Sequence, residues 1–480
     1  MTKDTCIVWF RRDLRLYDNP AWNAAVSSGC KIIPLFIHSP SEEGKWRRGG
    51  ASNWWLHHAL KDLSDQLEDH GLTLVIRSSG FSLTELTEIT QQQPVKAIYW
   101  NRCYEAQSVK RDTLIKENLI SDGILVQTFN GNLLFDPLKI TNKTNAPYRV
   151  FTPFWKNCLT LEIKTPETLK VKKTDSFTPI NLKNNGIDSL HLLPTIPWDT
   201  EMREFWEPTR SGAEKLLKQA IAKASHYSDL RDIPSEDATS RLSPYLHFGQ
   251  LSPAEFHHEV LTHTKAKDAA KMGILRQLFW REFSAHLLYH FPHTHDQPLR
   301  DEYQNFPWDF NAEILKKWQQ GQTGFPIVDA GMRQLWKTGW MHNRVRMVAS
   351  SFLVKHLLQP WQEGSHWFWD TLVDADLANN TQGWQWVGGC GADASPYFRV
   401  FNPILQSQKF DPTGSYIKKW LPELKNVPAE FIHTPWEMEP LELMAAGVKL
   451  GTDYPEQIIS HPDGRQRALD AYKNWKASLI

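Results

Sequence analysis

The residues best suited to chemistry lie on two stretches with helical spacing. In the stretch 277–292, an amide, an indole, a guanidinium and a hydroxyl fall on one helical face: Gln277, Trp280, Arg281 and Ser284. A second stretch, 341–358, carries Asn343, Arg346, Met347 and Ser350 on one face. The first of these faces suits a polar pocket with a stacking wall. The alternative for the first stretch is an exposed face that covers a neighbouring domain, and the alternative for the second is a surface Arg on an amphipathic helix.

A run of acidic, amide and indole residues follows, from Asp374 to Trp386. Asp374 and Asp376 resemble the start of a calcium loop, but Ala378 and Asn379 stand where that loop needs an oxygen ligand and Gly. We therefore reject a metal site here. A buried Arg346 would need an anionic partner, because an unpaired buried charge is too costly. Such a cation would suit a negatively charged ring.

The segment 227–243 reads YSDLRDIPSEDATSRLS and is followed by Pro244. Ser243 and Pro244 predict the start of a helix, which places Thr239 and Ser240 beside its first backbone N–H groups. Such a position binds phosphate through unpaired donors and the helix dipole. A pyrophosphate would suit it, and a plain serine cap is the alternative.

These side chains must be positioned by two different architectures. Short apolar segments at 6–10, 31–38, 72–78, 96–100 and 124–129 alternate with helical periodicity, which predicts a doubly wound parallel sheet over residues 1–130. Trp55, Ala59, Leu63 and Leu67 share a helical face that ends at Gly71. The first turn reads FRRDLRL and lacks G-x-G-x-x-G, so we do not expect NAD there.

The remainder divides into a connection and a helical domain. Residues 131–205 are rich in polar and turn residues and predict an irregular interdomain linker. From 206 to 480 helix signals dominate, including a capping box that begins at Ser252. We expect an all-α C-terminal domain.

The charge balance and the Trp, Cys and His residues limit which kinds of binding site the protein can have. The 54 Lys and Arg balance 54 Asp and Glu, so a nucleic-acid site must be a local patch. The 22 Trp suit stacking or electron transfer, although a large aromatic core is an alternative. Five separated Cys and isolated His, such as His342, predict neither a disulfide framework nor a metal site. We expect a cytoplasmic, monomeric protein without a membrane span, associated with the nucleoid when it binds DNA.

Four motifs in this order resemble the photolyase/cryptochrome family, in particular its microbial class I pyrimidine-dimer branch: TSRLSPYLHFGQLSP, WREF, GWMHNRVRM and DADLANN…WQW…PYFR. The resemblance spans nearly the whole chain. It implies an α/β antenna domain, a long linker and a helical domain that binds FAD. The implied FAD contacts are Tyr227, Thr239, Ser240, Arg241, Leu242, Ser243, Arg281, Arg346, Asp374, Asp376 and Asn380.

The resemblance also implies roles for several of these residues. Asn380 would lie at the flavin N5, and Arg346 and Asp374 would offset each other around an anionic reduced ring. Arg231 would be a second partner of Asp374 and would bridge the flavin site to the DNA surface. An electron-transfer chain of indoles would comprise Trp384, Trp361 and Trp308.

The implied substrate is UV-damaged DNA with a pyrimidine dimer flipped out of the duplex. Blue light absorbed by reduced FAD would drive an electron to the dimer, the ring would split, and the electron would return. The implied lesion contacts are Gln277, Trp280, Asn343, Met347 and Trp386, and the implied DNA contacts are Lys156, Arg231, Arg344, Arg399 and Gln406.

Two positions depart from the branch pattern. Gln277 stands where these enzymes usually carry Glu, and a Gln amide can donate an N–H but cannot supply a proton. Repair enzymes for (6-4) photoproducts carry Gln there, but they also use a His in the helix where this chain has Asn343 and Met347. Near Glu105, Gln107 and Ser108 replace the Asn and Glu of some folate-binding members. A deazaflavin, another flavin or an empty antenna site all stay open.

A cryptochrome-like blue-light photoreceptor is the competing function. Signalling members often have a long C-terminal tail, whereas here the last motif ends near Phe410 in a chain of 480 residues. A generic flavin oxidoreductase would need a nicotinamide site, for which the sequence shows no fingerprint. We therefore expect repair of cyclobutane dimers, with reduced efficiency because of Gln277.

Overall fold

The N-terminal part of the chain is built on one parallel sheet, in the strand order β3-β2-β1-β4-β5. The computed structural model describes residues 4–169 and 182–479. The strands are β1 (Thr5–Phe10), β2 (Lys31–His38), β3 (Val75–Ser78), β4 (Val95–Asn101) and β5 (Leu125–Phe129). All five predicted strands are confirmed. β3 begins later than predicted because the Leu72 N–H still bonds to the Leu67 carbonyl at the end of the preceding helix, 3.0 Å away.

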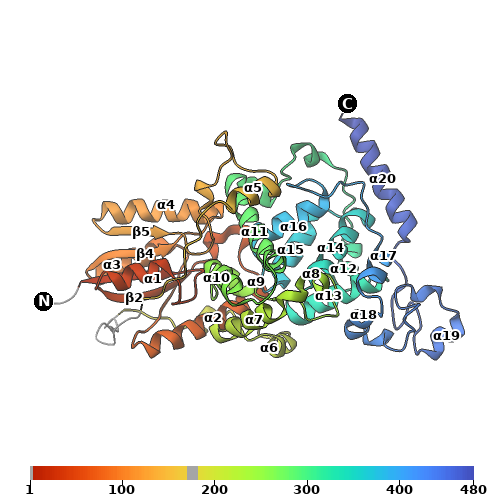
Figure 1. Ribbon diagram of the computed structural model, residues 1–480, viewed down its shortest axis with the longest axis horizontal. Helices are drawn as coiled ribbons and strands as arrows, with labels where there is room; N and C mark the ends of the chain where they lie inside the picture. Colours follow the sequence, from red (N-terminus) through yellow and green to blue (C-terminus); the bar gives the residue numbers. More distant parts are fainter. Residues whose placement is uncertain (1–3, 170–181, 480) are drawn as a thin grey trace.

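Helices cover both faces of this sheet, which confirms the doubly wound prediction (Figure 1). Helices α1 (Pro20–Ser27) and α2 (Gly50–Asp69) pack on one face, and α3 (Ser82–Gln92) and α4 (Ala106–Ser121) pack on the other. Burial on both faces explains why β1 is apolar or buried at every position.

The predicted linker is partly helical. It contains α5 (Phe151–Cys158) and α6 (Thr200–Phe205) between irregular segments, and its residues 170–181 lie outside the described residues. α5 packs beside α11 (Asp268–His290), where His286 Nε2 accepts a hydrogen bond from the Tyr148 N–H at 3.0 Å. The domain boundaries at 130 and 205 stay a prediction.

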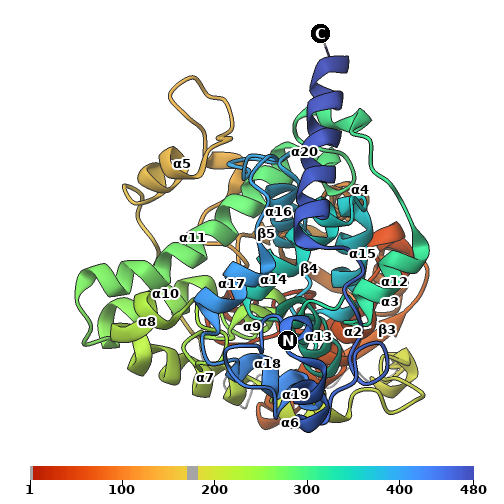
Figure 2. The same cartoon turned by 90° about the vertical axis from the view of Figure 1, so that its right-hand side faces the viewer.

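The C-terminal domain is helical, as predicted. Figure 1 shows α14 and α16 near its centre, and Figure 2 shows α11 running from the left side of the molecule towards them. In chain order its helices after α6 are α7 (Arg210–Lys223), α8 (Tyr227–Leu230), α9 (Ser243–Phe248), α10 (Pro253–His263), α11, α12 (Ala312–Gln319), α13 (Pro326–Thr338), α14 (Asn343–Ser351), α15 (Trp361–Thr371), α16 (Leu377–Gly388), α17 (Pro403–Phe410), α18 (Ser415–Trp420), α19 (Pro440–Ala445) and α20 (His461–Ser478).

Both predicted helix starts are present. The Ser252 side chain accepts a hydrogen bond from the Glu255 N–H at 2.9 Å and caps α10, while Ser243 and Pro244 begin α9. The stretch 341–358 differs from one regular helix, because α14 runs into a π-helical turn (Phe352–His356). This wider turn buries Lys355, whose Nζ donates to the Arg399 carbonyl at 2.9 Å.

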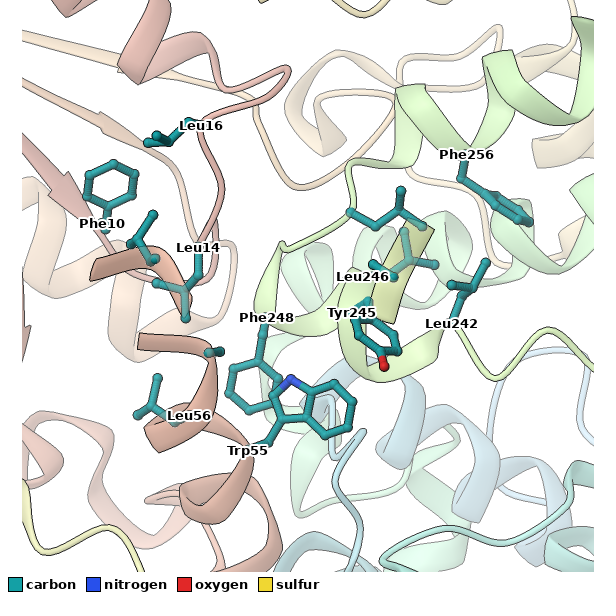
Figure 3. Close-up of a cluster of buried hydrophobic side chains, with 14 of the residues drawn as sticks. Phe10, Leu14, Leu16, Trp55, Leu56, Leu242, Tyr245, Leu246, Phe248 and Phe256 are labelled. Carbon is teal, nitrogen blue, oxygen red and sulfur yellow. The ribbon is translucent and has the colours of Figure 1, made fainter. Parts of the chain in front are cut away.

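The two domains share one hydrophobic cluster (Figure 3). Trp55 of α2 packs edge-on against Tyr245 of α9, with ring centroids 4.9 Å apart. The Leu14 N–H bonds to the Phe248 carbonyl at 3.0 Å. Gly249 has φ of +73°, and a Cβ there would overlap the Arg12 carbonyl, so only glycine allows this approach. The turn after β1 is therefore fixed against α9.

Candidate functional site

Asp374 lies at the centre of a contact between three segments of the helical domain. Arg346 of α14 donates from Nη2 to both carboxylate oxygens, at 3.1 and 3.0 Å. Ser243, the first residue of α9, donates its hydroxyl to Oδ2 at 2.6 Å. The Asp374 side chain is only 5% exposed, so the guanidinium supplies the partner that such a carboxylate needs. The implied contact between Arg346 and Asp374 is present.

Asp376 caps α16 and forms a second charged contact. Its Oδ1 accepts the Asn379 N–H at 2.9 Å, and its Oδ2 lies 3.3 Å from His247 Nδ1. Burial raises the pKa of Asp376, but the hydrogen bond to His247 and the charges of Arg281 and Arg12 outweigh it and hold that pKa well below its usual range. Asp376 therefore stays ionised at neutral pH.

Arg281 connects three parts of the chain that sequence reasoning treated separately. It lies on α11, and its guanidinium donates to the Asn132 carbonyl at 2.8 Å and to the Leu246 carbonyl at 3.2 Å. It also contributes to the low pKa of Asp376. Arg281 thus places a cation between the linker, α9 and the start of α16.

The segment before α9 carries the features expected of an anion site. Arg241 has φ of +52°, which costs a non-glycine residue about 1–2 kcal/mol. Its Nε is buried without a hydrogen-bond partner among the described residues. Thr239 and Ser240 are half-buried beside it, while Tyr227 and Leu242 are buried. A strained backbone and an unpaired guanidinium N–H fit a bound phosphate group.

Asn380 lies in the interior of α16 and is buried. Its Nδ2 donates to the Ser365 carbonyl at 2.9 Å and to the Ser365 hydroxyl at 3.0 Å. These two contacts fix the amide orientation, so Oδ1 is the atom directed away from α15.

The expected lesion contacts come from α11, α14 and α16. Trp280 is half-buried and stacks on Phe151 of α5, with centroids 3.6 Å apart and planes 6° apart. Asn343 is exposed, and its Nδ2 lies 3.9 Å from the Met347 sulfur. Trp386 is half-buried. Since α16 packs against both α11 and α14, one compact region supplies all of these side chains.

Arg231 does not contact Asp374, contrary to the expected pairing. Its Nη2 instead donates to Gln277 Oε1 at 3.3 Å, and its guanidinium lies 5.2 Å from the centre of the Tyr227 ring. The Asp374 carboxylate accepts instead from Ser243 and Arg346. The Gln277 NH₂ group donates to the Gly273 carbonyl at 3.3 Å, one turn earlier on α11, which leaves one of its two N–H bonds as a donor for a substrate.

The three expected electron carriers differ in depth. Trp384 and Trp361 are each 2% exposed, whereas Trp308 is half-buried. Trp384 also contacts two rings that the sequence did not single out, Phe368 at 5.0 Å and Trp318 at 6.1 Å between centroids. The three expected indoles thus range from the interior to the surface.

The expected DNA contacts are mostly accessible. Lys156 and Arg399 are exposed, and Gln406 is half-buried. Arg344 is partly committed within the protein, because its Nη2 pairs with Asp232 at 2.9 Å. Exposed Arg276 lies over the rings of Phe151 and Trp155 and adds a cation that the sequence analysis missed.

A cavity opens at the carboxyl ends of the strands, where the sheet order reverses between β1 and β4, and we refer to it below as the second cavity. Open α/β sheets bind ligands at such a switch point. Gln107 and Ser108, the positions expected at the antenna site, line this cavity. Its walls carry three indoles that suit a flat chromophore, namely Trp9, Trp46 and Trp369. They also carry four arginines that are each paired with a carboxylate, namely Arg11, Arg12, Arg48 and Arg111.

Two family models match the chain. One, described as DNA photolyase, matches residues 6–171, and the other, described as FAD binding domain of DNA photolyase, matches 274–474. A deoxyribodipyrimidine photo-lyase from Agrobacterium fabrum is 43% identical over 97% of each chain. The chain belongs to the photolyase/cryptochrome family. It contains the FAD-binding domain of that family, and FAD is its cofactor.

Other members of the family show how broad the similarity is. Cryptochrome-2 of Arabidopsis thaliana is 38% identical to this chain. The alignment covers 100% of this chain and 80% of the cryptochrome. The crystal structure of a bacterial class III photolyase from Agrobacterium tumefaciens superposes with a TM-score of 0.94 at 41% identity, covering 99% of this chain and 98% of that chain. These comparisons establish the family, and both photolyases and cryptochromes are among the relatives.

Within residues 4–169 and 182–479 no helix is long and apolar enough to span a membrane. Across the same residues, no group of three or more His, Cys, Asp or Glu side chains is arranged to hold a metal ion.

Proposed function

We propose that this chain repairs cyclobutane pyrimidine dimers in UV-damaged DNA in a light-driven reaction. The observation that carries the proposal is the stack of Trp280 on Phe151 beside exposed Arg276. A half-buried indole that is packed from behind offers a rigid, flat wall for a base that has left the duplex. Cations beside that wall attract the phosphate backbone.

When bound, reduced FAD supplies the light-excited electron for this reaction. The protein's part is geometry and electrostatics. Arg346 neutralises Asp374 and leaves the region free of a net negative charge that would oppose an anionic ring. Gln277 offers an N–H donor for a dimer carbonyl, and Trp280 and Trp386 exclude water from that hydrogen bond.

The cyclobutane dimer is favoured over the (6-4) photoproduct by the state of the nearby histidine. His342 is buried, and its Nδ1 accepts the Arg344 N–H at 3.2 Å, which caps α14. Burial lowers the pKa of His342 to about 4, so it is neutral at pH 7 and cannot act as an acid. Asn343 and Met347, at the positions expected for the (6-4) enzymes' histidine, carry no acidic proton. Gln277 remains the one feature that points to the (6-4) lesion.

A blue-light photoreceptor is the second candidate, and the similarity to Cryptochrome-2 of Arabidopsis thaliana supports it. A photoreceptor would show light-driven flavin reduction without dimer repair. A photolyase would show both.

Stacking can be tested with Trp280→Ala and Trp386→Ala. Each should weaken binding of dimer-containing DNA by about 5- to 150-fold, because base–indole stacking is worth about 1–3 kcal/mol. Trp336→Ala is the control, since Trp336 is 56% exposed on α13 and stacks only on Trp367 among the described rings. Equal binding by all three variants and wild type would remove the support for a lesion pocket at Trp280.

A further inference from the structure

Two cavities meet where the α/β domain joins the helical domain. One is the second cavity described above. The other, which we call the inner cavity, is lined by Arg281 and Asp376 among others. Both cavities share Arg12, Cys103, Glu105 and His247 as walls. A few side chains thus separate the expected antenna site from residues of the expected flavin site.

Arg12 occupies the middle of this partition. Its Nη2 pairs with Glu105 Oε1 of the α/β domain, and its Nη1 lies 3.8 Å from Asp376 Oδ2 of the helical domain. All three side chains are largely buried, with 15–17% of each exposed. Charges in such surroundings interact far more strongly than at a solvated surface.

The position of Arg12 is set by the backbone and not by its side chain alone. Its carbonyl lies against Gly249, and the neighbouring Leu14 is hydrogen-bonded to the Phe248 carbonyl; Figure 3 shows the adjoining packing of Leu14 and Phe248. The guanidinium therefore reaches Asp376 from a fixed origin. His247, at 3.3 Å from the same carboxylate oxygen, completes the contact.

We propose that Arg12 is a positioning residue of the flavin site: it fixes the carboxylate of Asp376 and connects that charge to Glu105 on the wall of the second cavity. This inference rests on the proposed function in one respect, namely that Asp376 lies beside bound FAD. A ligand in the second cavity that drew Glu105 or Arg12 towards itself would change the charge that the flavin experiences.

The sign of the electrostatic effect distinguishes this role from a structural one. Arg12→Gln removes one of the cations that offset the Asp376 charge, which disfavours an anionic reduced flavin and lowers the midpoint potential of bound FAD. Glu105→Gln leaves Arg12 with Asp376 as its only acidic partner among the described residues, which raises the potential. A purely structural role would shift both variants in the same direction.

The test is a spectroscopic redox titration of FAD-loaded protein, with FAD affinity measured in parallel. Arg12→Gln should lower the potential and weaken FAD binding about tenfold or more, because it removes one partner of a largely buried ion pair. Arg12→Lys should fall between Arg12→Gln and wild type. Arg11→Gln is the matched control, because Arg11 is also buried and lines the second cavity but pairs with Asp112 at 2.6 Å.

Potential shifts of the same sign in Arg12→Gln and Glu105→Gln, or equal shifts in Arg12→Gln and Arg11→Gln, would overturn the inference. If Arg12→Gln does not fold, the signs of the potential shifts in Arg12→Lys and Glu105→Gln are compared in its place. Asp376→Asn separates the two hypotheses. If it changes neither affinity nor potential, the proposed flavin site is wrong; if it changes them while Arg12→Gln does not, only the role of Arg12 is wrong.

Discussion

At the scale of single residues, Gln277 is the side chain on which the proposed lesion chemistry depends most. Its oxygen accepts from Arg231 and its NH₂ group donates to the Gly273 carbonyl, which leaves one amide N–H for the proposed substrate. Gln277→Glu would add a group able to supply a proton, and we expect more dimers repaired per absorbed photon. The gain should stay below about tenfold, because the amide already provides one hydrogen bond worth about 1 kcal/mol. Repair yield per flash measures it, and a loss of repair in Gln277→Glu would contradict this account.

Glu282, next to Arg281 on α11, makes stability depend on pH. Burial raises the pKa of Glu282 to about 7, against a reference of 4.5, although Arg281 and the N–H groups of Leu134 and Phe135 oppose the rise. The folded state therefore holds the proton more tightly than the unfolded state. The contribution of Glu282 to the free energy of unfolding is therefore fully present below pH 4.5 and is lost as the pH rises through about 7.

Glu282→Gln cannot titrate, so it should match wild type near pH 4.5 and exceed it at pH 8 by up to about 3 kcal/mol. Urea unfolding at the two pH values measures the difference. Exposed Glu117→Gln on α4 serves as the control and should show no such change. A wild-type protein as stable as Glu282→Gln at pH 8 would show that Glu282 is ionised without cost.

At the scale of elements, the packing of α15 on α16 holds Trp384. Gly364 of α15 lies against that indole so closely that a Cβ would overlap the ring. Gly364→Ala should therefore destabilise the protein by about 1–3 kcal/mol, as overpacked cores do, despite the better helix propensity of Ala. Gly383→Ala in α16 is the opposite control, since no atom lies within 4 Å of its Cβ position. Thermal unfolding measures the effect: the midpoint temperature should fall in Gly364→Ala and should rise or stay the same in Gly383→Ala.

The elements themselves were largely predictable, because periodicity and caps are local. The strands, the cap at Ser252 and the start of α9 follow from neighbouring residues. The π-helical turn at Phe352–His356 was not predictable, because its buried Lys355 finds its partner in a distant loop. The stack of Phe151 on Trp280 likewise joins segments 129 positions apart, which is the difference between their residue numbers.

The same distinction applies to the site. Motifs identified Arg346, Asp374 and Ser243, and the structure brings them into contact. Arg12 was quoted only as part of the first turn, because nothing in FRRDLRL indicates that its side chain reaches Asp376 across a domain junction. Arg231 was expected to pair with Asp374 but contacts Gln277 instead. A motif position alone does not show which side chains become neighbours in the fold.

At the scale of the whole molecule, a neutral chain must bind DNA through a local patch. Exposed Lys156 and Arg399 come from the linker and from the segment before α17. Lys156→Gln and Arg399→Gln should each reduce the slope of log K against log salt by about 1, because each removes one phosphate contact. Lys116→Gln on α4, also exposed, should leave the slope unchanged. Unchanged slopes in all three would place the DNA surface elsewhere.

The central claim, repair of cyclobutane dimers, is tested most directly by illuminating the reduced, FAD-loaded protein with blue light in the presence of separate oligonucleotides. One carries a cyclobutane dimer and the other a (6-4) photoproduct. We predict restored pyrimidines from the first only, with none in the dark. Repair of the (6-4) lesion alone would mean that Gln277 outweighs Asn343, Met347 and the neutral His342. Repair of neither, with the flavin still photoreducing, would contradict the account and identify a photoreceptor.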